Sequence, residues 1–135
     1  MVKLKSSAQI KLMHEGGKIL GEMLNILAQA VKPGITTKDL DKLANELFFR
    51  FQKKFPDANI KPAFLNYKQY PAVLCTSVND EVVHCIPSSR VLKDGDIIGL
   101  DFGLVYKSWN LDSAITVGVG KISLEAEKLI RVTKE

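Results

Sequence analysis

The sequence has few cysteines and no long apolar run, and each shortage excludes a class of protein. Cys75 and Cys85 are the two cysteines in 135 residues, too few for the disulfide framework of a small secreted protein, so two reduced thiols are the simplest interpretation. No second Cys/His pair lies at the spacing of a zinc site. No stretch approaches the roughly 20 apolar residues that span a bilayer, and the first residues lack the apolar core of a secretory signal. We therefore expect a cytoplasmic protein with no membrane partner.

Charge is modest and scattered along the chain. The formal net charge is +4, and apolar and charged residues make up 46% and 25% of the sequence, which are ordinary values for a globular protein. The lysines form no dense run that alternates with aromatic residues, so we expect a solvated surface and no specific nucleic-acid partner. The length fits a single domain, residues 1–135, that can bury a core.

The first third of the sequence has the periodicity of two amphipathic helices. Gly16-Gly17 lowers helix propensity within the first, residues 7–31, by roughly 1 kcal/mol per glycine, and a close packing partner is one reason to have them there. Thr36 and Asp39 resemble a capping pair for the second helix, which Pro56 ends. Apolar residues spaced by three and four mark the two buried faces: Ile10, Met13, Ile19, Met23, Leu27 and Ala30 in the first, and Leu40, Leu43, Leu47 and Phe51 in the second.

The remaining sequence predicts a loop, four strands and a last helix. Residues 60–71 are irregular and contain two prolines, which is typical of a loop with functional side chains. Strand-like runs follow at residues 72–76, 81–86, 96–105 and 109–119. A helix beginning at Ser123 is still running at Glu135 without a cap, so the chain looks cut off. Helices followed by antiparallel strands and another helix form an α+β pattern.

An aspartate within an apolar strand is the first indication of a site. Alternate residues of 97–105 are apolar on one face, and Asp101 falls on the other. With Tyr106-Lys107 as a two-residue hairpin loop, Asp101 would directly face Asp112, with Cβ atoms roughly 4.5–5.5 Å apart. Two such carboxylates repel each other unless a shared proton or a cation, most naturally a divalent metal, lies between them. Alternatively, one acid faces solvent, a lysine neutralises the pair, or a one-residue shift in register separates their faces.

His84 lies near the end of the short apolar run 81–86. A lone histidine is more often structural than catalytic, but His84 could orient a substrate, donate a hydrogen bond to a developing charge or bind a metal. Asp80 and Glu81 look like turn residues before that run. We do not expect them to be catalytic.

Several segments together resemble the methionine aminopeptidases, which are members of the pita-bread metallopeptidases. The resemblance covers essentially the whole chain and is carried, in order, by residues 8–20, 31–41, 70–87, 92–101 and 112–114. It implies an α+β structure that is half of a pita-bread fold, with two N-terminal helices packed on an antiparallel sheet. It also implies removal of the initiator methionine, with the N-terminal peptides of nascent proteins as substrates and the ribosome nearby.

The same resemblance implies a role for each candidate residue. Asp101 would bind one of two divalent metal ions (Co, Mn, Fe or Zn), Asp112 would bridge both, and His84 would be a catalytic residue that contacts the scissile peptide bond. Metal-activated water would attack the carbonyl after the first residue. A pocket of limited depth for the methionine side chain would be lined by Tyr67, Tyr70, Cys75 and, as a looser match, Phe64.

The chain also departs from the family pattern. Cys85 replaces the usual glycine after the histidine, and residues 107–111 replace a turn that usually carries glycines. The family completes its site with one histidine and two glutamates from a second half, which would lie beyond Glu135. We therefore expect little or no peptidase activity from this chain alone, and self-association through uncovered strands.

Two other functions remain open at this point. One is a non-catalytic pita-bread module that binds peptides, proteins or RNA, and the other is a related peptidase that cleaves before proline. Retention of Asp101, Asp112 and His84 together favours an enzyme over a binding module. The segment 77–87 favours the methionine enzyme over the proline-directed one.

Overall fold

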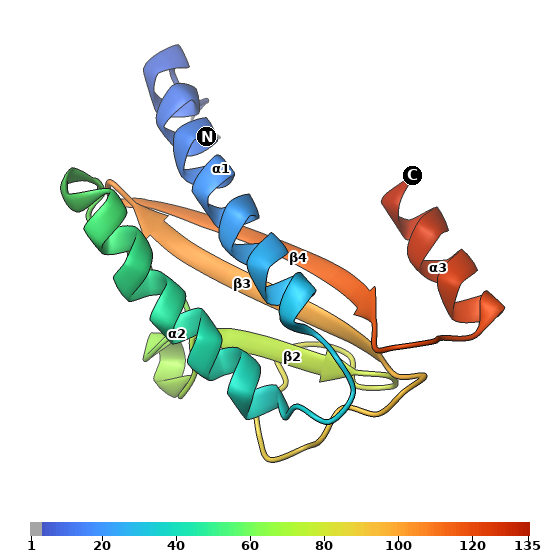
Figure 1. The fold of residues 1–135 in the computed structure, drawn as a ribbon. Coiled ribbons are helices and arrows are strands. Elements are labelled where there is room, and N and C mark those ends of the chain that lie inside the picture. The colour runs from blue at the N-terminus through green and yellow to red at the C-terminus, as the bar shows by residue number, and fades with distance from the viewer. Residues whose placement is uncertain (1–3) are drawn as a thin grey trace.

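The computed structural model describes residues 4–135, in which two long helices lie against one face of an antiparallel sheet (Figure 1). The helices are α1 (Ser7–Ala30), α2 (Thr37–Lys54) and α3 (Leu124–Lys134). Short 3-10 turns form η1 (Pro56–Ala58) and η2 (Tyr67–Gln69). The strands are β1 (Lys61–Pro62), β2 (Leu74–Val78), β3 (Ile97–Tyr106) and β4 (Trp109–Gly118).

This arrangement confirms the α+β prediction. Within residues 4–135, none of the helices combines the length and the apolar composition needed to cross a bilayer.

Both N-terminal helices begin at a capping box. The Ser6 hydroxyl accepts a hydrogen bond from Gln9 N at 3.3 Å, and Gln9 Oε1 accepts one from Ser6 N at 2.8 Å. Thr36 and Asp39 make the same reciprocal pair, which confirms the predicted cap. The hydrogen bond from the Thr36 hydroxyl holds the pKa of Asp39 below its ordinary value. These bonds satisfy backbone N–H groups that have no partner inside a helix.

The predicted buried faces of α1 and α2 agree with the structure except at a few positions. Ile10 is 57% exposed, because the first turns of α1 extend past the sheet (Figure 1). Met13, Ala30 and Leu43 are half-buried. The other predicted positions lie in the hydrophobic core: Ile19, Met23, Leu27, Leu40, Leu47 and Phe51.

Gly16 allows α1 to approach the sheet closely. A Cβ atom added at Gly16 would lie 2.8 Å from Tyr106 Cβ and would also overlap Leu111 Cδ1. A Cβ atom added at Gly17 would meet nothing within 4 Å. The close packing partner expected from the sequence therefore explains Gly16 and does not explain Gly17.

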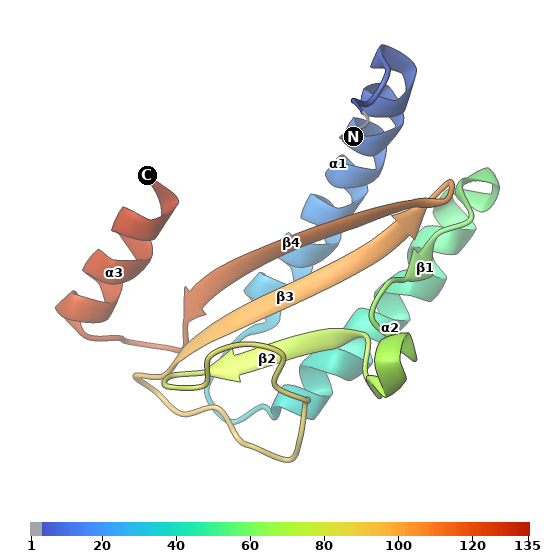
Figure 2. The same cartoon turned by 180° about the vertical axis from the view of Figure 1, so that it is seen from behind.

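β3 is the central strand of the sheet. β4 pairs with β3 along its whole length, while β2 and the two-residue β1 pair with β3 in its two halves. Leu100, Phe102 and Leu104 are fully buried beneath the helices, and the Phe48 and Phe102 ring centroids are 5.3 Å apart. Figure 2 shows the opposite face of the sheet, which α1 and α2 do not cover.

The predicted strand at residues 81–86 is wrong. These residues form a loop, which the hydrogen bond from Thr76 N to Cys85 O, 3.0 Å long, ties to β2. Val82, Val83 and Ile86 are exposed, so the apolar side chains that suggested a strand are not buried within residues 4–135. The other three strands agree with the predicted runs to within two residues at each end.

The connection from β4 to α3 is tightly packed, although α3 itself is not. A Cβ atom added at Gly118 would lie 2.8 Å from Ile122 Cγ2, so a glycine is needed where the chain leaves the sheet. The Ser123 hydroxyl accepts from Ala126 N at 3.2 Å and caps α3, as the sequence predicted. α3 has no buried residue and meets the sheet mainly at β4.

Candidate active site

Asp101 and Asp112 project from the same face of the β3–β4 hairpin but are not directly opposite. The loop is Lys107–Ser108, one residue later than predicted, so Asp101 pairs with Ala114 and Asp112 pairs with Gly103. The predicted register is therefore wrong by two residues. An even shift keeps both side chains on one face, and it makes the two aspartates diagonal neighbours, with Cα atoms roughly 7–8 Å apart.

The hairpin loop explains why the register was misjudged. Lys107 and Ser108 have φ values of 46° and 70°, as a type I′ turn requires, although Asn and Gly are the residues that favour it. Lys107 N donates to Ala58 O at 2.9 Å, and Lys107 Nζ lies 5.3 Å from the centroid of the Tyr106 ring. A hydrogen bond to a distant part of the chain and a contact with the neighbouring Tyr106 ring thus support a turn that the local sequence does not favour.

Gly103 brings an aromatic side chain next to the aspartates. A Cβ atom added at Gly103 would lie 2.6 Å from Phe64 Cε1 and 3.1 Å from Ala63 Cβ. Ala63 N also donates to Gly103 O at 3.1 Å. Because Gly103 is the cross-strand partner of Asp112, Phe64 packs beside that carboxylate.

A cavity of about 580 Å³ lies on this face of the sheet and contains both aspartates. The structure brings to it every residue that the sequence singled out for a site: Phe64, Tyr67, Tyr70, Cys75, His84, Asp101 and Asp112. Four further residues line it that the sequence did not single out: Lys68, Gln69, Pro71 and Ile86. Three of these belong to the irregular segment 60–71, and Ile86 is the last residue of the run 81–86 that contains His84. Their closeness in sequence to the named residues was the signal that could have found them. The individual roles stay predictions.

Tyr70 joins the cavity wall to the sheet. Its hydroxyl lies within hydrogen-bond distance of Leu74 O (3.0 Å) and Cys85 O (3.2 Å), which share its single proton. Burial raises the pKa of Tyr70 above its ordinary value. Cys75 is the cross-strand partner of Asp101, and burial raises the pKa of its thiol as well. Both groups therefore stay neutral and form an uncharged wall beside the carboxylates.

His84 reaches the cavity from the loop that follows β2. Its φ of 58° is uncommon for a residue with a Cβ atom. Glu81 fixes the start of this loop, because its carboxylate accepts from Val78 N at 2.8 Å and from Arg90 Nη1 at 2.5 Å. Glu81 therefore has a structural role in this loop.

The electrostatics of the site favour a bound cation. Burial, and then the negative charge of Asp112, raise the pKa of Asp101 to about 6. Two neighbouring carboxylates repel each other when both are ionised, and a divalent cation with oxygen ligands removes that repulsion. Residues 4–135 hold no group of three His, Cys, Asp or Glu side chains placed to bind a metal. The pair thus fits part of a metal site and needs further ligands.

Comparison with known proteins identifies what this arrangement is similar to. Residues 11–135 match metallopeptidase family M24. A curated methionine aminopeptidase from Clostridium acetobutylicum is 48% identical, with the match covering 100% of this chain and 52% of the relative. Crystal structures of methionine aminopeptidases from Rickettsia prowazekii and Thermotoga maritima superpose with TM-scores of 0.90 and 0.88, at 33% and 35% identity. Each superposition covers 99% of this chain and 51% of the other. The chain therefore spans about half the length of these relatives, and its fold is half of the pita-bread fold.

Proposed function

Because this chain belongs to metallopeptidase family M24, we propose that it supplies one side of a metal-dependent site that removes the N-terminal methionine from nascent proteins. The observation that carries this proposal is the convergence of Asp101, Asp112 and His84 on one cavity with a wall of aromatic and thiol side chains. The substrate is the N-terminal peptide of a newly made protein, and the bond cleaved is the one after its first residue.

Asp101 and Asp112 would hold the divalent ions. Both are carboxylates on one face of the hairpin, and the raised pKa of Asp101 reflects negative charge that lacks a cation beside it. When bound, such ions polarise a carbonyl group and lower the pKa of water, which supplies a nucleophile at neutral pH. The chain would provide two of the ligands, and the others would come from outside the part of the relatives that this chain matches.

His84 would act on the scissile peptide bond. Its exposed side chain enters the same cavity as the two aspartates. An imidazole N–H placed there can donate a hydrogen bond to the carbonyl oxygen as negative charge develops on it. Its left-handed backbone is held on one side by Glu81 and on the other by the hydrogen bonds to Cys85 O.

Tyr67, Tyr70, Cys75 and Phe64 would receive the side chain of the first residue. They surround the part of the cavity next to the aspartates, and Tyr70 and Cys75 stay neutral because burial raises the pKa of each. An unbranched thioether packs well against aromatic and sulfur-containing surfaces. Such a wall disfavours a charged first residue, which would lose its hydration without a partner.

Calorimetric titration with Mn²⁺ tests the metal-binding part of the proposal. We expect weak binding to the 135-residue chain, which Asp101→Asn and Asp112→Asn each weaken by about tenfold or more. Asp80→Asn is the matched control, because Asp80 is an exposed aspartate that does not line the cavity. A Mn²⁺ affinity that neither Asp101→Asn nor Asp112→Asn changes would refute the assignment of the metal ligands.

A peptidase assay tests the incompleteness of the site. We expect the chain alone to leave Met-Ala-Ser uncleaved in the presence of Co²⁺ or Mn²⁺, because two carboxylates do not complete the coordination of two metals. Cleavage by the wild-type chain that Asp112→Ala abolishes would show that this half is sufficient. Peptide binding that is independent of both aspartates and of metal would instead favour a non-catalytic module.

A further inference from the structure

We propose that Thr37 and Asp41 are positioning residues for the candidate site, because from one helix they hold the two segments that lead into the cavity. The two side chains, which we call the α2 clamp, fix where Tyr70 and His84 stand relative to each other. This inference rests on the proposed function and deepens it, since the positions of these two side chains decide whether a first residue fits beside the aspartates.

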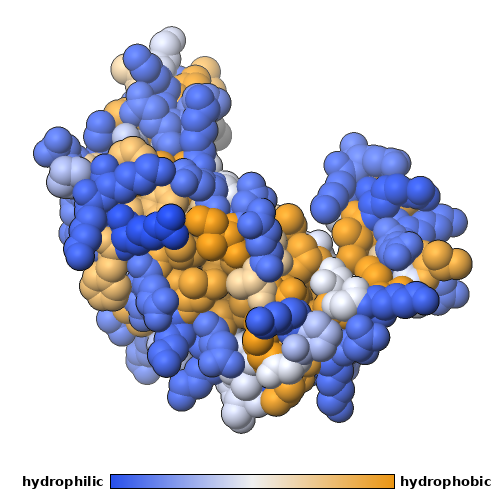
Figure 3. Space-filling model, in the orientation of Figure 1, coloured by the Kyte–Doolittle hydropathy of each residue, from blue (hydrophilic) through white to orange (hydrophobic). Residues whose placement is uncertain are grey.

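The clamp lies on one face of α2. Thr37 is the first residue of the helix and Asp41 follows four positions later, a spacing that puts both side chains on the same side. Thr37 is buried and Asp41 is half-buried, whereas hydrophilic residues cover much of the outer side of the helices in Figure 3. A carboxylate that gives up part of its hydration needs hydrogen-bond donors from the protein.

Asp41 finds those donors at the start of β2. Its Oδ1 accepts from Val73 N at 2.9 Å and from Leu74 N at 3.1 Å. Both residues are 0% exposed, so little water can reach these N–H groups. Neighbouring N–H groups of an extended strand point to opposite edges, and their convergence on one oxygen therefore fixes the bend through which the chain enters β2.

This bend carries an acceptor of the Tyr70 hydroxyl. Leu74 O lies 3.0 Å from that hydroxyl, and Cys85 O lies 3.2 Å from it. Thr76 N also donates to Cys85 O at 3.0 Å. Because Cys85 directly follows His84, a displacement at the start of β2 changes the surroundings of the tyrosine and of the histidine together.

Thr37 holds the far end of the loop that carries His84. Its hydroxyl donates to Ser88 O at 3.1 Å and accepts from Ser88 N at 2.8 Å. Lys38 N donates to Ser88 O at 2.9 Å, and Thr37 N donates to Arg90 O at 3.0 Å. N–H groups in the first turn of a helix have no partner inside it, so this segment supplies their acceptors and is bound in place by them.

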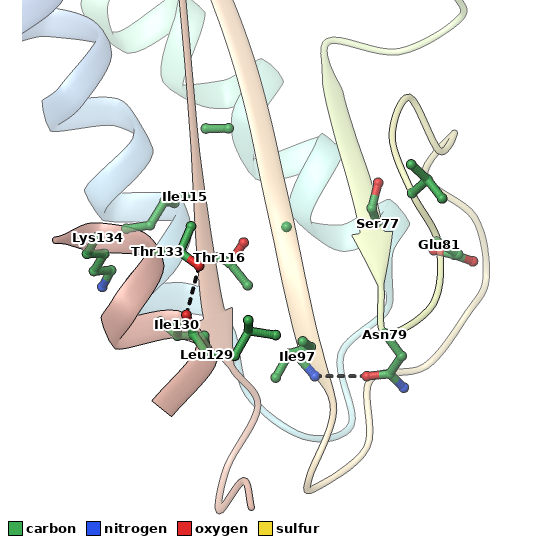
Figure 4. Close-up of a pocket in the computed structure, with 13 residues that line it drawn as sticks. Ser77, Asn79, Glu81, Ile97, Ile115, Thr116, Leu129, Ile130, Thr133 and Lys134 are labelled. Carbon is green, nitrogen blue, oxygen red and sulfur yellow. Dashed lines mark hydrogen bonds between the residues drawn. The ribbon is translucent and has the colours of Figure 1, made fainter. Parts of the chain in front are cut away.

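The start of the same loop is held from the sheet. Asn79 Oδ1 accepts from Ile97 N at 3.0 Å, and Figure 4 shows this bond where the loop leaves β2. Glu81 accepts from Val78 N at 2.8 Å. The span that carries His84 is therefore fixed by β2 and β3 at its start and by the clamp at its end.

The helix gives the clamp a constant spacing. Leu40 and Ala44 lie in the same turns of α2 and are 1% and 0% exposed, so the helix cannot slide without opening the packed core. The two anchor points stay about 6 Å apart along the helix axis. A site whose walls are held in advance loses less free energy when it orders a substrate.

Native-state amide hydrogen exchange of the 135-residue chain in EDTA, followed by NMR, tests the clamp. Asp41→Ala should accelerate exchange at the Val73 and Leu74 amides by about tenfold or more, because these buried groups lose their acceptor. Asp41→Asn keeps an uncharged acceptor and should give an intermediate acceleration. Thr37→Val should accelerate exchange at Ser88 by a smaller factor, about threefold, because Ser88 is exposed.

Two side-chain resonances show whether the loss reaches the cavity. The ring carbon that bears the Tyr70 hydroxyl, labelled with ¹³C and assigned with Tyr70→Phe, should shift in Asp41→Ala toward its position in the urea-unfolded chain. Asp41→Asn should bring it part of the way back. Thr37→Val should shift the imidazole resonance of His84 and leave that of His14, the other histidine, which is exposed on α1.

Two control variants separate the clamp from ordinary loss of stability. Met23→Ala removes a side chain of α1 that is 0% exposed, and it should lower stability without shifting the Tyr70 or His84 resonance. Glu46→Ala removes an exposed acid from α2 and should leave amide exchange within about twofold of wild type.

An exchange pattern in Asp41→Ala that matches Met23→Ala, or a Tyr70 resonance that does not move, would overturn the positioning role. If Asp41→Ala fails to fold, Asp41→Asn decides in its place. Acceleration confined to the Val73 and Leu74 amides supports the clamp, and wild-type exchange at both amides overturns it.

Peptide binding scores the proposed function separately. Met-Ala-Ser with a fluorophore at its C-terminus is titrated with the chain and Mn²⁺, and fluorescence anisotropy gives the affinity. Asp41→Ala should weaken binding by about threefold or more, and Glu46→Ala should not. If the wild-type chain binds no peptide while the resonances shift as expected, the proposed function is contradicted and the clamp is supported. Equal binding by wild type and Asp41→Ala would contradict the role of the clamp in fitting the first residue.

Discussion

The two faces of β3 contrast in what they contribute, although their residues alternate along one strand. Leu100 and Phe102 are fully buried beneath α1 and α2, whereas Asp101 and Gly103 face the open side of the sheet and help to form the cavity. One face binds the helices through apolar contact, and the other keeps a carboxylate and leaves room for an aromatic side chain. A strand can thus separate folding from chemistry by the direction in which each residue points.

The largest expected effect is on the helix-facing side. Phe102→Ala removes a ring that is 0% exposed and packs against Phe48, so we expect it to lower the free energy of unfolding by about 3–5 kcal/mol. Urea denaturation followed by circular dichroism measures the change. Val105→Ala, on the opposite face and half-buried, is the control and should cost about 1 kcal/mol. Equal losses at both positions would remove the contrast.

The second effect tests the space that Gly103 leaves for Phe64. Gly103→Ala places a methyl group 2.6 Å from Phe64 Cε1, and we expect the resulting overpacking to cost about 1–3 kcal/mol. Phe64→Ala should remove most of that cost in the double variant, which a double-mutant cycle reports as a coupling energy. Gly17→Ala is the control: its added Cβ atom meets nothing within 4 Å, and a helical Gly→Ala change should stabilise by about 0.5–1 kcal/mol.

The third effect is a pH dependence of stability that arises from Asp101 on the open face of the sheet. The folded-state pKa of Asp101 is raised to about 6 from a value of 3.8, so the folded protein binds this proton more tightly than the unfolded chain does. Its contribution to stability is full below pH 3.8 and is lost as the pH rises through about 6. Asp101→Asn should therefore match wild type near pH 3.5 and be more stable at pH 7. We expect a gain on the order of 1 kcal/mol, because solvent screens a partly exposed carboxyl.

Thermal denaturation of both proteins between pH 3.5 and 7 measures this difference. The comparison isolates Asp101, because both proteins also contain Asp39 and Asp96. The pKa values of these two aspartates are lowered, so they change stability in the opposite direction to Asp101 but equally in both proteins. Added Mn²⁺ should reverse the order at pH 7, since the cation favours the ionised carboxylate. A wild-type chain that remains as stable as Asp101→Asn at pH 7 in EDTA would contradict the proposed repulsion.

The sequence predicted the helices, and which residues meet at one cavity, better than it predicted the turns between strands. Helix periodicity and the Thr36–Asp39 capping pair are local signals, so both N-terminal helices were located to within one or two residues. The hairpin register depended on Lys107 and Ser108, whose left-handed conformation the local sequence does not favour and whose turn is bonded to Ala58 O. The direction in which Asp101 and Asp112 point was nevertheless correct, because an even shift leaves the alternation of the strand unchanged.

The loop of residues 81–86 was harder to predict for a different reason. Its valines have high strand propensity, but propensity in a sheet reflects packing against neighbours, and no described neighbour covers Val82 or Val83. The conformation of the segment around η2 was equally hard to predict from sequence, since Asn66, Lys68 and Gln69 all adopt positive φ values. Positive φ values are uncommon at residues other than glycine, so a sequence pattern does not predict three of them in one short segment.

The smallest expected effect concerns a polar residue on the helix-facing side of the sheet. Thr76 is the cross-strand partner of Leu100 and is 2% exposed, and its hydroxyl oxygen has no hydrogen-bond partner among the described residues. Thr76→Val replaces the hydroxyl with a methyl group of similar size, so we expect a gain of about 1 kcal/mol, measured by urea denaturation. Ser77→Val, one residue along and on the open face, should bring no such gain. If both substitutions stabilise equally, the two faces do not differ in their tolerance of polar groups, and if Thr76→Val destabilises, the hydroxyl has a partner that keeps it satisfied in solution.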